Sequence, residues 1–192
     1  MRRTLMLVGV ISLAVVTSAH AQQSRWSIEL DAGAAIPTQN LAGADLQTGM
    51  GFGTNVRFRL QPHLSAYAGW EWHHFTTDQL VARDDVDVED TGYSFGLRFE
   101  HPLVGRTLGW VRAGGIGNHI ELENDGGDEI GDTKHGLGFE LGGGLTLPLR
   151  ERLALTPGVR YRSLSRDLEV GAATRSSTLS YVQVGMGVAW TF

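Results

Sequence analysis

The chain has 192 residues, of which 42% are hydrophobic and 19% are charged, and its formal net charge at pH 7 is −5. It contains no cysteine, which excludes both a disulfide framework and a lipid-modified cysteine. Its length is that of one domain, and no low-complexity linker divides it.

The N-terminal segment has the features of a secretory signal peptide. Arg2 and Arg3 precede an apolar run over residues 4–16, and Ala21 completes a small-x-small cleavage site. The run is shorter than the roughly 20 residues that a membrane-spanning helix needs. We therefore expect residues 1–21 to be a signal peptide and residues 22–192 to be the exported domain.

The remaining chain alternates between apolar and small or polar residues, which predicts β-strands. In the last segment, Val184, Met186 and Val188 alternate with Gly185 and Gly187. Each segment is close to the roughly 9 to 11 residues that a tilted membrane strand requires. The predicted strands are residues 26–36, 50–60, 64–75, 91–100, 107–120, 135–147, 153–164 and 178–192.

The connections between these strands alternate in length. Those after the second, fourth and sixth strands are short and contain Pro62, Pro102 and Pro148, whereas the others run to about a dozen residues or more. Short turns at one end and long loops at the other are typical of outer-membrane barrels. Pro157 lies within the seventh strand, where we expect a bulge or a later start of the strand, because proline cannot donate a ladder hydrogen bond.

Periodicity alone does not say which face lies inside, so a soluble lipocalin-like barrel is an alternative. The apolar face, however, carries many large side chains, including Phe52, Trp70 and Phe139. An eight-stranded barrel is only just wide enough to be filled, so this face does not fit inside it. The opposite face is rich in glycine, which allows tight curvature and leaves room for long polar side chains.

Charge placement favours a barrel with lipid outside, because Arg or Lys facing lipid at mid-bilayer costs roughly 2 to 4 kcal/mol. All charged residues within the predicted strands can be placed on the glycine-rich face. For Arg112 this placement is undecided, because the sequence GWVRAGGIG does not show whether the even- or the odd-numbered residues of its strand face inward. These residues are Arg57, Arg59, Arg98, Arg112, Arg160, Arg162, Glu29, Asp31, Glu71, Glu100 and Glu140.

Together these features resemble the eight-stranded outer-membrane barrels of Gram-negative bacteria, the OmpA- and OmpX-like group. The resemblance rests on the signal peptide, the eight strands, the prolines of three short turns and the closing VGMGVAWTF. It implies an all-β, antiparallel, up-and-down transmembrane barrel without a periplasmic domain, monomeric and surrounded by outer-membrane lipid and lipopolysaccharide. It also implies an assembly signal read by the barrel assembly machinery, which Met186, Val188, Trp190 and Phe192 match.

The inward charges predict an ion-pair network in the lumen, because buried charges are tolerable when paired. A sealed polar core is the favoured interpretation, and a narrow ion-conducting channel gated by exchange of pairs is the alternative. The function expected is accordingly structural or interactive, in envelope integrity and surface contacts. The residues assigned to the network are Arg57, Arg59, Glu71, Arg98, Glu100, Glu140, Arg160 and Arg162.

Two predicted loops, residues 75–91 and 121–134, are strongly acidic. They would repel nucleic acid, so no nucleic-acid partner is expected, but they could meet lipopolysaccharide phosphates through bridging Ca²⁺ or Mg²⁺. Glu121, Glu123, Asp125 and Asp132 loosely resemble a calcium loop, although the flanking helices are missing. A solvated acidic loop is the default, and no motif predicts a cofactor or a resident metal.

A lipid A-modifying hydrolase or acyltransferase is the third hypothesis, because some small outer-membrane barrels that resemble this chain remodel lipid A. Such an enzyme needs a nucleophile and a base within hydrogen-bond reach. The chain has no HxSN-like or GxSxG-like motif, so an enzyme is not expected. The candidates would be His73, His74, His119 and His135 with Ser94, Ser163 or Ser180.

Overall fold

The computed structural model describes residues 25–39, 46–81, 84–124, 129–133, 136–170 and 173–192. Side chains are described for these residues except within 78–86, 122–135 and 166–177. The predicted signal peptide lies outside the described residues. Within them, no helix is long and apolar enough to cross a membrane.

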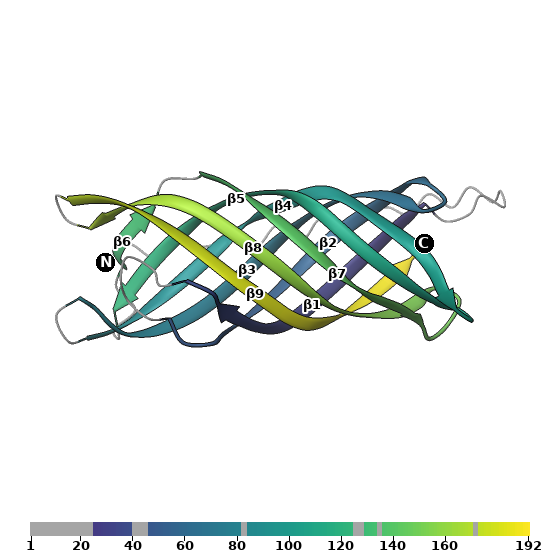
Figure 1. The fold of residues 1–192 in the computed structure, drawn as a ribbon, viewed down its shortest axis with the longest axis horizontal. Coiled ribbons are helices and arrows are strands. Elements are labelled where there is room, and N and C mark those ends of the chain that lie inside the picture. Colours follow the sequence, from purple (N-terminus) through teal and green to yellow (C-terminus); the bar gives the residue numbers. More distant parts are fainter. Residues whose placement is uncertain (1–24, 40–45, 82–83, 125–128, 134–135, 171–172) are drawn as a thin grey trace, which may run out of the picture.

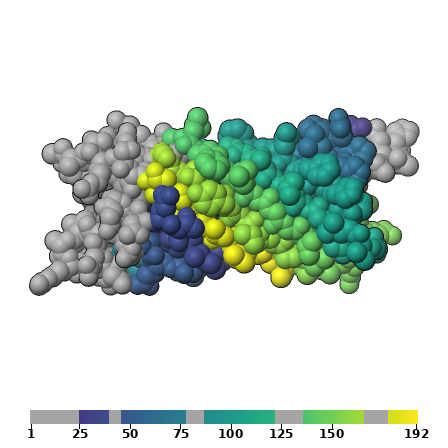
Figure 2. Space-filling model, viewed as in Figure 1, coloured from purple at the N-terminus to yellow at the C-terminus, as the bar shows by residue number. Residues whose placement is uncertain are grey.

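The described residues form a closed antiparallel β-barrel (Figure 1). Each strand pairs with its neighbours, and β1 pairs with β9 to close the wall, so that the first strand in blue borders the last in yellow (Figure 2). The short strand β6 pairs with β5 and β8 beyond the end of β7, so the wall is eight strands around. The strands are β1 (Trp26–Pro37), β2 (Gly49–Gln61), β3 (Leu64–Val81), β4 (Asp84–Val104), β5 (Thr107–Asn124), β6 (Glu129–Thr133), β7 (Gly136–Pro148), β8 (Leu153–Val170) and β9 (Ala173–Thr191).

The eight-stranded fold and its strand order are as predicted, but the strands are longer at one end. The β3–β4 ladder continues to the pair Val81 and Asp84, and the β8–β9 ladder to Val170 and Ala173. Most of the predicted acidic loops therefore belongs to paired hairpins, where the ladder satisfies the backbone hydrogen-bonding groups. We call this the hairpin end, and the opposite end, which holds Trp26 and Phe192, the turn end.

Neither the bulge nor the later strand start expected at Pro157 is present, since β8 begins at Leu153. The β8–β9 register is continuous through Pro157, which lies opposite Met186. On the other side, the β7–β8 ladder is interrupted between the pairs Gly144–Gly158 and Leu147–Leu155, with equal spacing on both strands. The missing donor of proline thus removes local pairing toward β7 without adding a residue.

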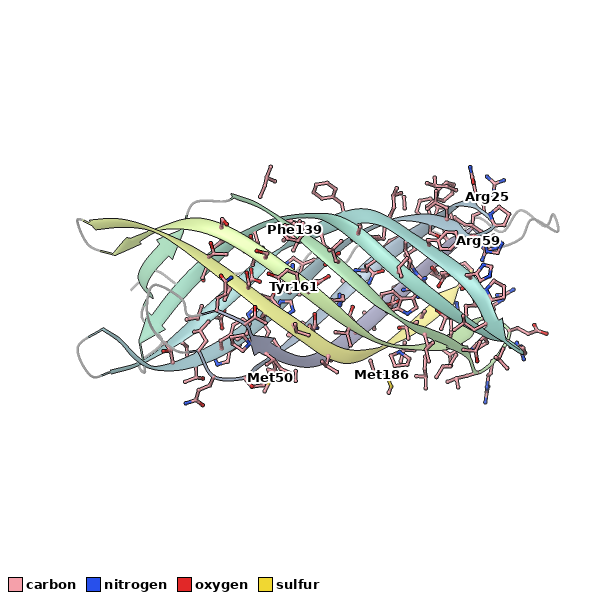
Figure 3. All side chains as sticks on the ribbon, viewed as in Figure 1. Arg25, Met50, Arg59, Phe139, Tyr161 and Met186 are labelled. Carbon is pink, nitrogen blue, oxygen red and sulfur yellow. The ribbon has the colours of Figure 1, made fainter. Side chains whose placement is uncertain are left out.

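The outer wall is apolar. Leu30, Tyr93, Leu141 and Met186 are each more than half exposed, as are other large hydrophobic residues on β1, β2, β4, β5 and β7 (Figure 3). Aromatic rings pair across strands, with ring centroids 4.7 Å apart for Trp26 and Phe58 at the turn end. Soluble proteins rarely expose an apolar surface of this extent to water, so the outer wall indicates contact with lipid.

At the hairpin end the inward face of the strands is apolar and the outward face is polar, the reverse of the arrangement in the middle of the barrel. Phe75 and Val88 lie inside and are fully buried, whereas their chain neighbours His74, Thr76 and Glu89 lie on the outward face. The inward apolar side chains there pack into one group, which we call the luminal apolar cluster. It consists of Ala35, Phe75, Val88, Ile116, Ile120, Leu164, Leu179 and Tyr181, with Leu46 packed against it.

Candidate functional site

The lumen holds the buried polar residues of the barrel, and β5 contributes to it through its even-numbered positions. Trp110 and Arg112 are 6% and 5% exposed, whereas Val111 between them is 59% exposed. The structure thereby resolves the open parity of this strand, and Arg112 faces the lumen together with the other buried arginines.

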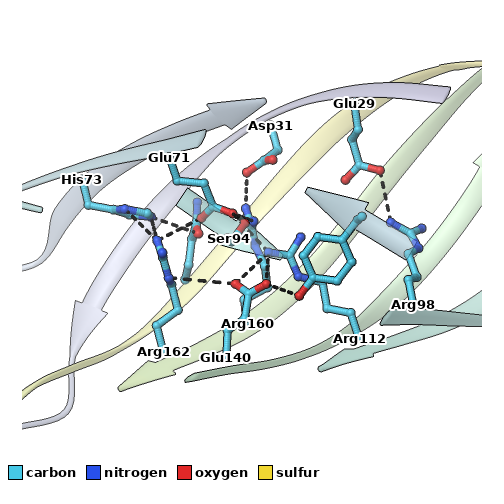
Figure 4. Close-up of polar contacts among 12 residues, drawn as sticks. Glu29, Asp31, Glu71, His73, Ser94, Arg98, Arg112, Glu140, Arg160 and Arg162 are labelled. Atoms are coloured by element: carbon cyan, nitrogen blue, oxygen red, sulfur yellow. Dashed lines mark hydrogen bonds and ion pairs between the residues drawn. The ribbon is translucent and has the colours of Figure 1, made fainter. Parts of the chain in front are cut away.

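Glu71 on β3 is the centre of the ion-pair network (Figure 4). Its Oε1 accepts hydrogen bonds from Arg112 Nη2 at 3.1 Å and Arg160 Nη1 at 3.0 Å. Its Oε2 accepts from Arg162 Nη1 at 2.9 Å, and Ser94 also donates to Oε1 at 3.1 Å. One carboxylate that is 2% exposed therefore compensates three arginines from β5 and β8.

A second buried carboxylate, Glu140 on β7, closes the network on the opposite wall. Arg112 Nη2 donates to Glu140 Oε2 at 2.7 Å, and Tyr67 donates to Oε1. The guanidinium of Arg112 also lies over the Tyr67 ring, with its Cζ 4.6 Å from the ring centroid. Arg160 pairs further with Asp31 on β1, so the network spans the lumen from β1 to β7.

A separate group of ion pairs lies toward the turn end. Arg98 donates to Glu29 at 3.1 Å and to Glu100 at 2.9 Å, and Arg57 lies 3.5 Å from Glu29 and 3.3 Å from Glu100. The Arg98 guanidinium stacks on Trp110 at 4.4 Å. Two arginines and two carboxylates balance here, so this layer is electrically neutral.

Toward the hairpin end, the network continues through hydrogen bonds. Arg162 Nη1 donates to the Tyr181 hydroxyl at 3.0 Å and lies 3.1 Å from His73 Nδ1, and His73 Nε2 lies 3.1 Å from Gln183 Oε1. The Tyr181 hydroxyl donates to Asp90 at 2.7 Å. Immediately beyond lies the luminal apolar cluster, which Tyr181 joins through its ring.

Of the residues that the sequence assigned to the network, seven make ion pairs in the lumen, and Arg59 makes none with the side chains that the structure describes. Arg59 instead lines a cavity at the turn end. Sequence reasoning did not assign several further members to the network, although their inward position follows from strand parity, because His73 and Ser94 were considered for catalysis and Asp90 for a loop. These are Tyr67, His73, Asp90, Ser94, Tyr181 and Gln183.

The residues matched to an assembly signal lie on the outward face of β9, next to β1. Met186, Val188, Trp190 and Phe192 are between 44% and 54% exposed. The Phe192 amide donates to the Trp26 carbonyl at 3.0 Å, which holds the terminal residue against the first strand.

The residues considered for catalysis have other partners. Ser163 and Ser180 share a hydrogen bond of 3.0 Å, and Ser94 donates to Glu71. His74 lies 3.6 Å from Asp87 and 3.7 Å from Glu89, and His119 lies 2.5 Å from Glu121. His135 lies outside the described residues. Among the described side chains, these serines are therefore not paired with a histidine base.

The calcium-like segment is also extended where it is described. Glu121 and Glu123 belong to β5, and Glu121 lies opposite Asp132 of β6. The register places the backbones of Glu121 and Asp132 side by side, while the side chains of Glu123 and Asp132 are not among those described, so a calcium site here stays a prediction. Asp125 lies outside the described residues.

Comparisons with known proteins agree with this architecture. A family model described as "Outer membrane protein beta-barrel domain" matches residues 4–192. Among the curated proteins, none matches the chain.

Solved structures with the same fold share little sequence with this chain. Neisserial surface protein A is 14% identical, with a TM-score of 0.63 over 87% of this chain and 97% of that one. Ail of Yersinia pestis, solved in complex with the heparin analogue sucrose octasulfate, is 11% identical, with a TM-score of 0.53 over 88% and 100%. OprG from Pseudomonas aeruginosa is 10% identical, with a TM-score of 0.56 over 88% and 97%.

The closed eight-stranded wall, its lipid-compatible outer face and its polar lumen are the features of this family, whose short turns face the periplasm and whose long hairpins face outward. The chain therefore belongs to the outer membrane protein beta-barrel domain family and is a β-barrel protein of the bacterial outer membrane.

Proposed function

We propose that this protein is a sealed envelope barrel, with a structural and interaction role outside its lumen and no enzymatic activity. The observation that supports the proposal is that two groups of buried side chains lie in the lumen, one after the other along its axis. The ion-pair network around Glu71 fills the middle, and the luminal apolar cluster fills the extracellular part.

The apolar cluster argues against ion conduction. Phe75, Ile116, Ile120, Leu164 and Leu179 are each 0% exposed, and they come from four strands that face one another. A permeating ion would have to leave water to pass this group, because an apolar constriction excludes the hydration shell. Exchange of ion pairs below would not open such a barrier.

Single-channel recording of the chain from Gln22 in planar bilayers tests the seal. We expect no conductance steps from the wild type or from Glu140→Ala, because the apolar cluster remains in both. Glu140→Ala combined with Phe75→Gly and Leu164→Gly removes side chains from both groups and should give steps, which shows that the procedure inserts barrels into the bilayer. Heat-modifiable migration on gels checks that each variant is folded.

The opposite result would change the function assigned. Steady wild-type openings, altered by Glu140→Ala, would replace the sealed barrel with a narrow ion-conducting channel.

The outer wall at the extracellular end provides the contact surface. Trp72 marks the membrane boundary, since tryptophan favours the interface. Its Nε1 donates to Glu89 at 3.1 Å, and its ring stacks on His74 with centroids 5.8 Å apart. Asp87 and Glu89 thus lie just beyond the apolar wall, at the depth of lipopolysaccharide phosphates. Divalent cations can bridge these carboxylates to the phosphates.

This partner can be tested by stability. Lipopolysaccharide with Mg²⁺ should raise the free energy of unfolding of the wild type in urea by about 1 to 3 kcal/mol, because a ligand of the native state stabilises it. Asp87→Asn with Glu89→Gln should lose most of this gain, and so should removal of Mg²⁺. Glu151→Gln at the other end is the matched control and should keep it. Equal gains in all three proteins would count against the proposed contact.

A further inference from the structure

We propose that the periplasmic mouth of the barrel is a binding pocket for phosphate-bearing anions. A cavity of about 290 Å³ opens there between the ends of β1, β2 and β9 and the turns that follow β4 and β7. It is separate from the lumen seal and from the extracellular surface, and it plays no part in the function proposed above.

The wall of the cavity has an excess of positive charge. Six arginines line it: Arg57 belongs to the neutral layer at the floor, and the other five lie in the wall beside a single wall glutamate, Glu151. The only other carboxylate in the lining, Glu100, already accepts hydrogen bonds from Arg98 and Arg57 in the neutral layer that forms the floor. The wall arginines are Arg25, Arg59, Arg106, Arg150 and Arg152.

These arginines converge from four separate parts of the chain. Arg25 precedes β1, Arg59 is on β2, Arg106 follows the left-handed Gly105 in the β4–β5 turn, and Arg150 is in the β7–β8 turn. Figure 3 shows the labelled Arg25 and Arg59 at the same end of the barrel. Among the described residues, none of these side chains makes an ion pair with a carboxylate.

Like charges around a concave space repel one another, and the low-dielectric barrel wall focuses their field into the cavity. A bound anion relieves this repulsion. Guanidinium groups match phosphate in particular, because their planar fork can donate two parallel hydrogen bonds to its oxygens. Ser27 and Ser65 add hydroxyl donors to the lining. The volume suits a phosphate group with a small substituent.

Two sources can supply this chemistry. One is the headgroup of an anionic phospholipid in the inner leaflet of the outer membrane, which lies beside the mouth. The other is a soluble phosphate ester of the periplasm. Both would present the same phosphate oxygens to the same arginines.

Isothermal titration of inorganic phosphate into the chain from Gln22, folded in a maltoside detergent that carries no phosphate, tests the pocket. We expect saturable binding with one site per barrel. Replacement of Arg59, Arg150 and Arg152 by glutamine should weaken it by about tenfold or more, because charge-assisted hydrogen bonds to phosphate are lost. Arg166→Gln, the same charge change in the extracellular part of β8, should leave it unchanged.

Nanodiscs distinguish the sources. If a disc that contains phosphatidylglycerol suppresses phosphate binding relative to a pure phosphatidylcholine disc, the occupant is a lipid headgroup. Equal binding in both discs identifies a soluble anion. Absence of saturable binding, or equal affinity in the triple variant and the wild type, would overturn the proposal. Gel mobility of heated and unheated samples confirms that the variants are folded.

Discussion

Replacement of Glu71 by alanine is expected to lower the free energy of unfolding of the barrel by about 3 to 5 kcal/mol, the range found when one partner of a buried ion pair is removed. Glu71 is 2% exposed and accepts hydrogen bonds from Arg112, Arg160 and Arg162. Arg112 and Arg160 keep Glu140 and Asp31 as partners, but Arg162 lies 4.0 Å from its next carboxylate, Glu140. The loss therefore leaves a buried positive charge poorly compensated.

Urea unfolding in detergent micelles or bilayers, followed by tryptophan fluorescence, measures this effect. Glu151→Ala removes the same group from an exposed position in the β7–β8 turn and should change stability by less than about 0.5 kcal/mol. A loss below about 1 kcal/mol for Glu71→Ala would mean that water or rearranged arginines compensate the missing carboxylate, and that the network is not a rigid plug.

The facing of most strands could be predicted from sequence because lipid tolerates so few arrangements. An arginine such as Arg98 or Arg160 cannot face hydrocarbon, so its position fixes the parity of its whole strand. Arg112 was the exception, because Trp110 and Ile116 on the same parity made both faces of β5 appear apolar. The structure explains these two residues: Trp110 stacks under Arg98, and Ile116 belongs to the luminal apolar cluster.

The luminal apolar cluster could not be predicted from a rule that places every apolar residue outside. Beyond the membrane the outer face of the strands is in contact with water, whereas the lumen there excludes water. Apolar residues therefore point inward and polar residues outward, the reverse of the alternation within the membrane. The sequence carries a signal of this inversion, since Phe75 is flanked by His74 and Thr76, and Val88 by Asp87 and Glu89. These carboxylates indicated a loop because acidic residues are rare in strands, but their alternation with valine is that of a strand.

The choice of partners within the network was also beyond sequence reasoning. Pairs such as Arg160 with Asp31 join β8 to β1 across the lumen, and their distance depends on the stagger of the strands around the barrel. Sequence gives the facing of each residue but not its height along the axis. For the same reason Arg59 was assigned to the network, although it lies too close to the mouth to reach it.

The second large effect is expected at the seam where the first and last strands meet. Gly33 on β1 lies directly opposite Gly185 on β9. A Cβ atom on Gly33 would lie 2.4 Å from the Val184 carbonyl oxygen and 2.6 Å from Gly185 Cα, which are backbone atoms that cannot move without opening the ladder. Gly33→Ala should therefore cost roughly 3 kcal/mol or prevent closure of the barrel.

Gly117→Ala is the matched control for this substitution, because a Cβ atom on Gly117 would meet nothing within 4 Å. Alanine restricts the unfolded chain more than glycine does, so this variant should be unchanged or more stable by roughly 0.5 kcal/mol. Both substitutions replace glycine by alanine. Their effects on the free energy of unfolding differ in sign only if packing between β1 and β9 decides the outcome. Folding yield on gels and urea midpoints give both values. A Gly33→Ala barrel as stable as Gly117→Ala would show that β1 and β9 can separate locally without loss of the fold, and that closure does not depend on the glycine pair.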